Sequence, residues 1–349
     1  MKRIKSLLIK NNTLGNVKRL LNMAKGKGGA ALLMYGSPDP DAIAAAMALR
    51  VIFRQKSAIR SFGFFSTEPA VRHQNIEMIR AMKIDIRPVN QFDPAAYPLV
   101  ALVDAQPPFF ANSLGEIHPQ IVIDHHQFIP GWQAELEDIR KDYGALSTLM
   151  LEYLLAAKVR IPRMLYTALA YGIKTDTNNL ERDALIEDIG AYHLSLTHAN
   201  RELLRRIEFD QIPERFMKYF DLAFRYRRRY RDRMLCFLEK VESLDACVQV
   251  ADFLIHIINI YYVAVAGIVK DRMIIVLRGD GYRLDCGAVA ERAFGAYGSA
   301  GGHRSAARVE IPLETLRTIL SGDLSRQAVE HFMVERFREA RRKHGSRKP

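Results

Sequence analysis

The sequence predicts an α/β protein: a mainly parallel sheet flanked by helices, followed by a smaller α/β domain. In roughly the first third of the chain, short apolar runs alternate with segments whose apolar residues recur every three or four positions, the pattern of strands joined by crossover helices. The length of 349 residues also exceeds the roughly 250–300 residues that one core usually supports. Two domains are therefore expected.

The first domain is expected to open with an amphipathic helix capped by Thr13 and stopped by Gly26 and Gly28. The alternation that follows predicts, in order, strand 31–35, a turn and helix in GSPDPDAIAAAMALRVIF, strand 58–65, helix 74–82, and strands 84–89, 98–103 and 120–123. Apolar spacing then becomes helical and predicts helices over 144–158, 162–174 and 184–198.

The arginine-rich run RYRRRYRDR at 225–233 is expected to be a solvated connecting helix, with a phosphate-facing surface as the alternative. Beyond it, the pattern predicts paired strands at 261–269 and 272–277, a helix at 288–294, a glycine-rich loop at 296–308 and a last strand at 309–311.

These elements divide the chain into four expected parts. They are a first domain of residues 1–195, a helical connector of 196–235, a second domain of 236–325 and a basic C-terminal helix or tail of 326–349. A cleft between the two domains is expected to hold the ligand.

The net charge of +12 is concentrated at the two ends of the chain. Residues 1–28 carry eight Lys or Arg and no acid, and residues 325–349 carry eight against three Glu, so the remaining body is close to neutral. This distribution excludes a chain built throughout as a polyanion-binding surface. Each basic end is either a cationic tail that draws in anionic substrates or a solvated helix face.

The cysteines and the apolar runs argue against disulfide-stabilised, zinc-thiolate and membrane-spanning proteins. Three cysteines without CxxC spacing argue against a disulfide framework or a thiolate zinc site. The longest apolar stretch, 253–269, contains His256 and Asn259 and is expected to be a helix end followed by a strand, not a membrane span. A cytoplasmic protein with no membrane contact is expected.

Acidic and histidine side chains follow three of the predicted strands, where an open parallel sheet binds its ligands. Crowded carboxylates repel one another, so a pair of divalent ions would stabilise them. Carboxylate and imidazole ligands favour Mn²⁺, Fe²⁺ or Zn²⁺ and allow Mg²⁺. Taken singly, each residue has a structural alternative, such as a helix cap or turn residue. The residues are Asp39 and Asp41 in a PDPD turn, Asp104, and the triplet Asp124-His125-His126.

These residues form an ordered set of motifs that resembles the DHH phosphoesterases, a family named for the Asp-His-His triplet. The motifs are PDPDAIAAA, LVDA ending at Asp104, VIDHH, ALAYGIKTDTNNL with Asp176, and, in the C-terminal part, VLRGD and GGHRSAA. The resemblance covers almost the whole chain. The C-terminal part resembles the domain that accompanies the DHH domain in this family.

The resemblance implies a two-metal site. Asp39 would bind the first ion, Asp41, His125 and Asp176 would bind the second, and Asp104 would bridge the two. Two Mn²⁺ ions are expected, with Mg²⁺ or Co²⁺ as alternatives. Such a pair can activate a water molecule and stabilise both the attacking and the leaving oxygen in phosphoryl displacement.

Other roles follow from the same resemblance. His126 would lie beside the scissile phosphate and, with Asp104, belong to the catalytic residues, while Asp124 would orient a neighbouring histidine. In the second domain, the predicted substrate-binding residues are Arg278, Gly301, Gly302 and His303.

Two positions depart from the family pattern, and the first of them affects a metal ligand. The histidine that normally stands four residues before the first Asp is replaced here by Tyr35, whose neutral phenol is a poor ligand at pH 7. The first ion is therefore expected to bind weakly, to arrive with substrate, or to be dispensable. Arg308 also replaces the glycine that usually follows the GGH motif.

The resemblance implies a hydrolase similar to nano-RNases and pAp phosphatases. A metal-bound hydroxide would attack phosphorus in a short single-stranded oligonucleotide or nucleotide and release a mononucleotide. The processive RecJ-type exonucleases have additional nucleic-acid-binding regions, for which a chain of 349 residues is expected to have no room. Cyclic-dinucleotide phosphodiesterase or exopolyphosphatase-like hydrolysis is the close alternative, and a nucleotide-binding protein with catalysis degraded at Tyr35 is the other. A homodimer is left open.

Overall fold

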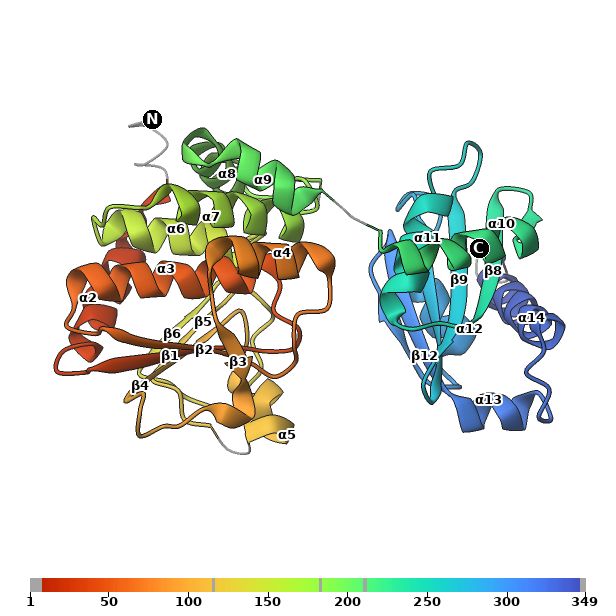
Figure 1. The fold of residues 1–349 in the computed structure, drawn as a ribbon, viewed down its shortest axis with the longest axis horizontal. Helices are drawn as coiled ribbons and strands as arrows, with labels where there is room; N and C mark the ends of the chain where they lie inside the picture. The colour runs from red at the N-terminus through yellow and green to blue at the C-terminus, as the bar shows by residue number, and fades with distance from the viewer. Residues whose placement is uncertain (1–7, 115–116, 182–183, 210–211, 346–349) are drawn as a thin grey trace. The chain divides into compact units, whose positions relative to one another are not determined.

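The computed structural model describes residues 8–114, 117–181, 184–209 and 212–345, the last five by their backbone alone. They form two compact units that divide between residues 211 and 212, inside the predicted connector (Figure 1). Lys2, Arg3 and Lys5 of the predicted basic N-terminal end lie outside the described residues, as do Arg347 and Lys348 of the C-terminal end.

The first unit is built on a sheet of six parallel strands, which confirms the predicted parallel sheet and adds one strand to the five that the sequence predicts. The chain adds strands on one side of β1 and then crosses to the other side, giving the order β3-β2-β1-β4-β5-β6. The chain therefore leaves β1 and β4 in opposite directions along the sheet, which creates a switch point where parallel sheets bind ligands. The strands are β1 (Gly29–Met34), β2 (Ser61–Ser66), β3 (Ile86–Pro88), β4 (Leu99–Val103), β5 (Ile121–Asp124) and β6 (Leu136–Ile139).

Helices cover this sheet, and α3 lies at the centre of them (Figure 1). Because α3 packs against β1 and β4 on one side and against α6 and α7 on the other, nearly all of its alanine-rich length is buried. The α-helices of the unit are α2 (Asn11–Met23), α3 (Pro40–Lys56), α4 (His73–Met82), α5 (Ala111–Leu114), α6 (Leu146–Ala156), α7 (Arg163–Asp176), α8 (Ile186–His198) and α9 (Arg201–Glu208). Two short 3₁₀ turns, η1 (Val89–Gln91) and η2 (Pro107–Phe110), complete it.

Two details of the first unit differ from the prediction. Helix α2 begins after Lys10, not at a Thr13 cap, because Thr13 is buried inside the helix and its hydroxyl donates to Glu152. Strand β6 was not predicted, since its sequence LEDI alternates over only four residues.

The second unit holds another six-stranded sheet, in the order β11-β12-β10-β9-β8-β7. All neighbours are antiparallel except β8 and β9, which are parallel. The strands are β7 (Arg228–Tyr230), β8 (Arg233–Lys240), β9 (Tyr262–Val269), β10 (Arg272–Gly279), β11 (Ser299–Gly302) and β12 (Ala306–Pro312). The helices are η3 (Glu214–Phe216), α10 (Met217–Tyr226), α11 (Leu244–Leu254), α12 (Cys286–Phe294), α13 (Leu313–Ile319) and α14 (Arg326–Gly345).

Two segments of this unit correct the sequence prediction. The arginine run at 225–233 is not a helix: α10 ends at Tyr226, and an edge strand, a turn and the start of β8 follow. Both faces of β7 are exposed, so no alternation of apolar and polar residues marks it as a strand. The predicted loop at 296–308 is largely the β11–β12 hairpin, in which pairing with β10 overrides the low strand propensity of glycine and alanine.

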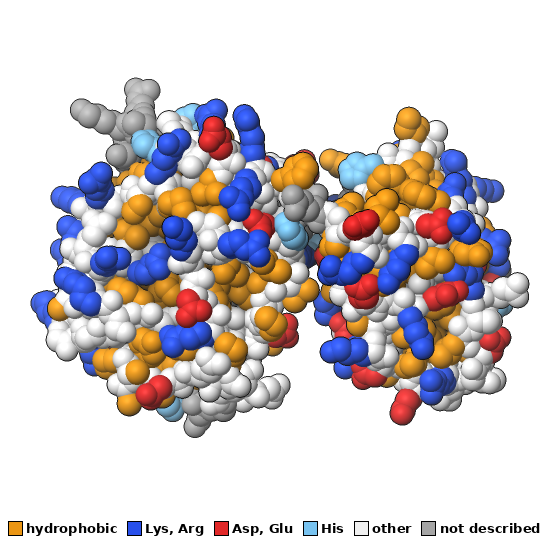
Figure 2. All heavy atoms as spheres, viewed as in Figure 1, with side chains coloured by type: hydrophobic (Ala, Val, Ile, Leu, Met, Phe, Trp, Pro, Cys, Tyr) orange, Lys and Arg blue, Asp and Glu red, His pale blue; other side chains and the backbone are white. Residues whose placement is uncertain are grey.

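The basic C-terminal segment forms helix α14, which packs on β8 and α12. Val329, Phe332 and Met333 are buried in one core together with Phe294 of α12. Helix α14 therefore contributes to the fold of the second unit. On the face shown in Figure 2, Lys and Arg of this unit are interspersed with Asp and Glu rather than gathered in one patch. Within the described ranges, no helix is long and apolar enough to span a bilayer.

Candidate active site

The predicted metal ligands gather at the switch point of the first sheet. Strands β1 and β4 pair in parallel with Leu33 opposite Leu102, so both end at the same edge. The loop after β1 leads to Asp39 and Asp41, and Asp104 is the first residue after β4. Asp124 ends the neighbouring strand β5, and the two histidines follow it.

Asp41 is the most deeply held of the carboxylates. It lies in the first turn of α3, and its oxygens accept hydrogen bonds from the backbone N–H groups of Leu146 (2.6 Å) and Ser147 (2.8 Å) at the start of α6. Gly172 of α7 makes this packing possible, because a Cβ there would lie 2.3 Å from Ser147 Oγ and 2.9 Å from Asp41 Oδ1. Burial, followed by the charges of Asp176 and Asp104, raises the pKa of Asp41.

Asp39 is the N-cap of α3, the structural role that the sequence also allowed. Its Oδ1 accepts from the Ala42 N–H at 2.9 Å. Burial and the nearby Asp104 charge raise the pKa of Asp39 to about 7. A capping role needs no such crowding of carboxylates, so the cap does not by itself account for the position.

Asp104 has a left-handed backbone, with φ of 58°. Its N–H donates to the Ile123 carbonyl at 3.0 Å, which ties the end of β4 to β5. Its Oδ1 is buried and has no hydrogen-bond partner among the described residues. A non-glycine residue in this conformation with an unsatisfied oxygen is costly, as expected for a residue held for function.

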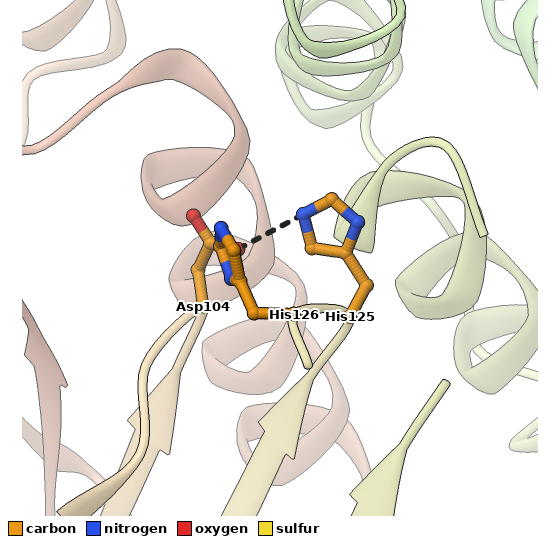
Figure 3. A group of neighbouring side chains, drawn as sticks. All are labelled: Asp104, His125 and His126. Atoms are coloured by element: carbon orange, nitrogen blue, oxygen red, sulfur yellow. Dashed lines mark ion pairs between the residues drawn. The ribbon is translucent and has the colours of Figure 1, made fainter. Parts of the chain in front are cut away.

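His125 faces three carboxylates. Its Nδ1 lies 2.9 Å from the Tyr143 carbonyl oxygen, which leaves Nε2 pointing into the site. Nε2 lies 3.1 Å from Asp176, 3.3 Å from Asp104 and 3.9 Å from Asp41. Burial lowers the pKa of His125, but the neighbouring Asp104 and Asp176 carboxylates outweigh burial and raise it to about 12. Figure 3 shows the His125 ring turned toward Asp104 from the end of β5.

His126 is oriented by Asp124. The buried Asp124 carboxylate lies 2.8 Å from His126 Nδ1, and it accepts from the Gln106 side chain at 2.7 Å. Burial raises the pKa of Asp124, but the hydrogen bonds that its carboxylate accepts, above all the one with His126, outweigh burial and lower it. The bond to Asp124 in turn raises the pKa of His126. The His126 side chain is about half exposed, at 53%, so its ring can reach a bound ligand.

The side chains fit divalent ions in two overlapping groups. Asp41, His125 and Asp176 each offer a ligand atom within 4.8 Å of the others, and so do Asp104, His125 and His126. The buried His125 Nε2 and Asp104 Oδ1 have no hydrogen-bond partner among the described residues, so a cation between them would satisfy both. Asp39 belongs to neither group.

Tyr35 follows β1 directly and lies in an aromatic cluster. Its ring stacks on Phe109 with centroids 5.2 Å apart and meets Phe110 edge-on at 5.7 Å. Phe110 is fully buried, whereas Tyr35 is 48% exposed. Since β1 and β4 are in register, the position of Tyr35 is beside that of Asp104.

The predicted substrate-binding residues lie in the second unit. Arg278 is opposite Ala306 across β10 and β12, and the His303 N–H donates to the Ala306 carbonyl at 2.7 Å, so both are at the same end of the sheet. Arg278 Nε donates to Asp252 at 2.5 Å, and His303 is exposed.

The two glycines of the GGH motif differ in their surroundings. Gly302 has φ of 149°, and a Cβ there would come within 2.4 Å of the Ala306 carbonyl oxygen, so the hairpin itself requires glycine. A Cβ at Gly301 would meet nothing within 4 Å. The fold therefore explains Gly302 and leaves Gly301 unexplained.

Sequence reasoning missed several residues that shape the first site. They are Gln106, which supports Asp124, Tyr143, whose carbonyl orients His125, and Gly172, which admits Asp41. The carbonyl contact of Tyr143 leaves no trace in the sequence, because every residue type offers a carbonyl. Gly172 inside an apolar helix was a signal, since such a glycine often marks close packing.

No protein-family profile matches the chain. An uncharacterized protein of Methanocaldococcus jannaschii is 28% identical over 345 residues, which cover 96% of this chain and 69% of that protein. An exopolyphosphatase-related protein from Bacteroides fragilis superposes with a TM-score of 0.67 at 15% identity, covering 95% of this chain and 98% of that structure. The chain therefore shares the fold of this exopolyphosphatase-related protein.

The predicted α/β fold, a mainly parallel sheet followed by a second sheet domain, is thereby confirmed. Two further structures superpose less well. A pGpG-specific phosphodiesterase from Vibrio cholerae has a TM-score of 0.37 at 13% identity, covering 83% of this chain and 96% of that chain. RecJ from Thermus thermophilus in complex with Mg²⁺ has a TM-score of 0.42 at 11% identity, covering 95% of this chain and 52% of that chain. At these TM-scores neither structure bears on the fold of this chain.

Proposed function

We propose that this chain is a metal-dependent phosphoesterase that hydrolyses short oligonucleotides or nucleotide phosphates. The observation that carries the proposal is the convergence of Asp41, Asp104 and Asp176 on His125 Nε2 at the switch point of a parallel sheet. Anionic and imidazole ligands without sulfur suit Mn²⁺, with Mg²⁺ or Co²⁺ as alternatives.

Divalent ions held here would lower the pKa of a coordinated water and neutralise charge on the reacting phosphate. In this proposal Asp39 would hold the first ion, Asp41, His125 and Asp176 would hold the second, and Asp104 would be a ligand of both. The Tyr143 carbonyl keeps the proton of a neutral His125 on Nδ1, so that Nε2 is free to bind metal.

His126 would act on the substrate. Its bond to Asp124 raises its pKa, so the ring carries a proton more readily and can donate to an anionic phosphoryl oxygen. Asp124 thus positions a donor without contacting the substrate. Arg278 and His303 would contribute further donors to anionic parts of the substrate.

Tyr35 and Phe109 favour a substrate that contains a base. An exposed tyrosine supported by a stacked phenylalanine offers a flat face on which a nucleobase can stack. Inorganic polyphosphate has no ring to use this surface. The exopolyphosphatase-related neighbour keeps polyphosphate hydrolysis as the second candidate, and cyclic dinucleotides share the same chemistry with linear ones.

The test is release of mononucleotides from RNA of two to five nucleotides in Mn²⁺, run beside pAp, a cyclic dinucleotide and inorganic polyphosphate. We expect turnover of the linear or phosphorylated nucleotides and its loss in EDTA. Binding without turnover in Mn²⁺, Mg²⁺ or Co²⁺ would instead identify a nucleotide-binding protein whose catalysis was lost with the histidine at position 35. Cytoplasmic location and a homodimer stay predictions.

A further inference from the structure

The second unit contains a pocket of about 770 Å³, a size that suits a small-molecule ligand. It lies where the turn after β7, the first residues of β8 and β9, and helix α14 meet. All of its lining residues belong to this one unit, and the metal-ligating cluster around Asp104 belongs to the other.

Arginines from the run at 225–233 line this pocket. Arg231 and Arg233 enter from the turn and from β8, and Arg338 enters from α14. The lining contains one acid, Asp232, whose carboxylate lies 3.6 Å from Arg233 Nε. Arg338 pairs with Glu335, outside the lining, at 2.7 Å, an exposed pair within one helix that is weak in water. The excess positive charge fits an anionic ligand.

The remaining wall is apolar. Leu235, Ala264, Val334 and Phe337 line it together with Tyr262, whose ring meets Phe337 edge-on at 5.8 Å. The Tyr262 hydroxyl is buried and has no hydrogen-bond partner in the part of the chain that the structure describes. A buried hydroxyl without a partner is destabilising, so Tyr262 brings an unsatisfied polar group to the wall of the pocket.

The pocket lies at the end of the sheet that also carries Arg278. Tyr262 is opposite Gly279 in the β9–β10 pair and beside Arg233 in the β8–β9 pair. Arg278 contacts Asp252 of α11, whereas Val334 and Arg338 of α14 line the pocket on the opposite face of the sheet. The lining also lacks Gly301, Gly302 and His303, so the pocket is a different place from the predicted substrate-binding residues.

We propose that this pocket binds a nucleotide, with its ring system against Tyr262, Val334 and Phe337 and its phosphate at Arg231, Arg233 and Arg338. Apolar walls and arginines together recognise a flat ring joined to a phosphate, which neither a purely apolar nor a purely anionic ligand supplies. The proposal rests on the proposed function only in taking nucleotides as the ligand class. The ligand is either a free nucleotide or one nucleotide of a bound strand.

The experiment uses full-length protein in EDTA, so that binding is measured without hydrolysis. Calorimetric titrations with AMP and with a three-nucleotide adenylate RNA compare the wild type with two variants. Val334→Trp fills the pocket without changing charge, and Arg231→Gln with Arg338→Gln removes charge without filling it. Arg317→Gln, an exposed arginine of α13 outside the lining, is the control. Circular dichroism verifies that each variant is folded.

We expect both changes to weaken binding about tenfold or more and the control to leave it unaltered. If AMP and the trinucleotide are affected alike, the pocket takes free nucleotides; if only the trinucleotide is affected, it holds one nucleotide of a strand. Loss of binding in the double arginine variant with wild-type binding in Val334→Trp would mean surface electrostatics alone and would overturn the proposal. Wild-type binding in both variants would overturn it as well.

Hydrolysis in Mn²⁺ is measured separately on the same proteins. If the protein does not hydrolyse nucleotides but binds them, and Val334→Trp abolishes this binding, the proposed function is rejected and the proposed pocket is kept. If the protein hydrolyses nucleotides and neither variant changes its affinity for them, the proposed pocket is rejected and the proposed function is kept.

Discussion

The two units hold their predicted site residues in different ways. In the first, the buried Asp41 and the largely buried His125 are fixed by backbone hydrogen bonds that direct polar atoms toward one point. In the second, Arg278 already pairs with Asp252, and Gly302 is required by its hairpin. Polar groups buried against one another signal function because folding alone disfavours them. Exposed or structurally required residues give no such signal.

The largest expected effect tests the buried cluster directly. Asp104→Asn keeps the shape of the side chain but removes a charge that both ions would share, so turnover should fall about 10³-fold or more. Steady-state hydrolysis of a dinucleotide in Mn²⁺ measures this, with Asp85→Asn, a highly exposed acid of the same unit, as the control. Comparable turnover in the two variants would remove Asp104 from the active site.

The difference between the units also explains how far sequence reasoning reached. Parallel strands with apolar runs, such as 98–103 and 120–123, end at one edge, so the strand pattern alone is enough to place Asp104 near His125. Edge strand β7 and the β11–β12 hairpin were not predicted from the sequence, because their exposed arginines and small residues form strands only through pairing with neighbouring strands. Asp124 was expected to orient a neighbouring histidine and does so two residues away, whereas its partner Gln106 is 18 residues distant, a tertiary contact that no local pattern encodes.

A smaller effect is expected from Asp124→Asn. The amide can no longer favour a proton on His126, so the ring loses its orientation and its raised pKa. We expect kcat to fall about 10- to 100-fold and the alkaline limb of its pH profile, where His126 loses its proton, to move to lower pH. The pH profile of kcat distinguishes this from a structural defect, which would lower kcat at every pH without moving the profile.

Tyr35 separates ring recognition from metal binding. Tyr35→Ala removes a stacking face, so KM for a dinucleotide should rise about tenfold while hydrolysis of inorganic tripolyphosphate, if present, stays the same. Tyr35→Phe is the matched control that keeps the ring. Equal losses on both substrates would show that Tyr35 does not act through stacking.

The same position tests the first metal site. Tyr35→His restores an imidazole where the family pattern has one, and it should tighten Mn²⁺ binding and raise activity at low Mn²⁺. Calorimetric titration of metal-free protein with Mn²⁺ measures the change. Unchanged affinity would show that the site accommodates tyrosine without loss.

The smallest effect concerns the pH dependence of stability without metal. Asp39 has its pKa raised from 3.8 to about 7, and His125 from 6.5 to about 12, so the folded state binds extra protons. The free energy of unfolding that proton binding at Asp39 contributes is therefore lost as the pH rises from about 4 to 7. The contribution of His125 is lost as the pH rises from 6.5 toward about 12.

The melting temperature in EDTA should therefore fall from pH 5 to 8. The gain on adding Mn²⁺ should grow over the same range, since the ion competes with these protons. Asp39→Asn should flatten the EDTA profile below pH 7. A melting temperature that rises with pH in EDTA would contradict the proton-binding cluster.

The most direct test of the account is anomalous diffraction from crystals of the protein soaked in Mn²⁺. We predict a peak among Asp41, His125 and Asp176, with a second peak on the other side of Asp104 at higher Mn²⁺ or with bound nucleotide. Ordered Mn²⁺ elsewhere, with His125 Nε2 still directed only at carboxylates, would contradict the central claim that this cluster is a metal centre.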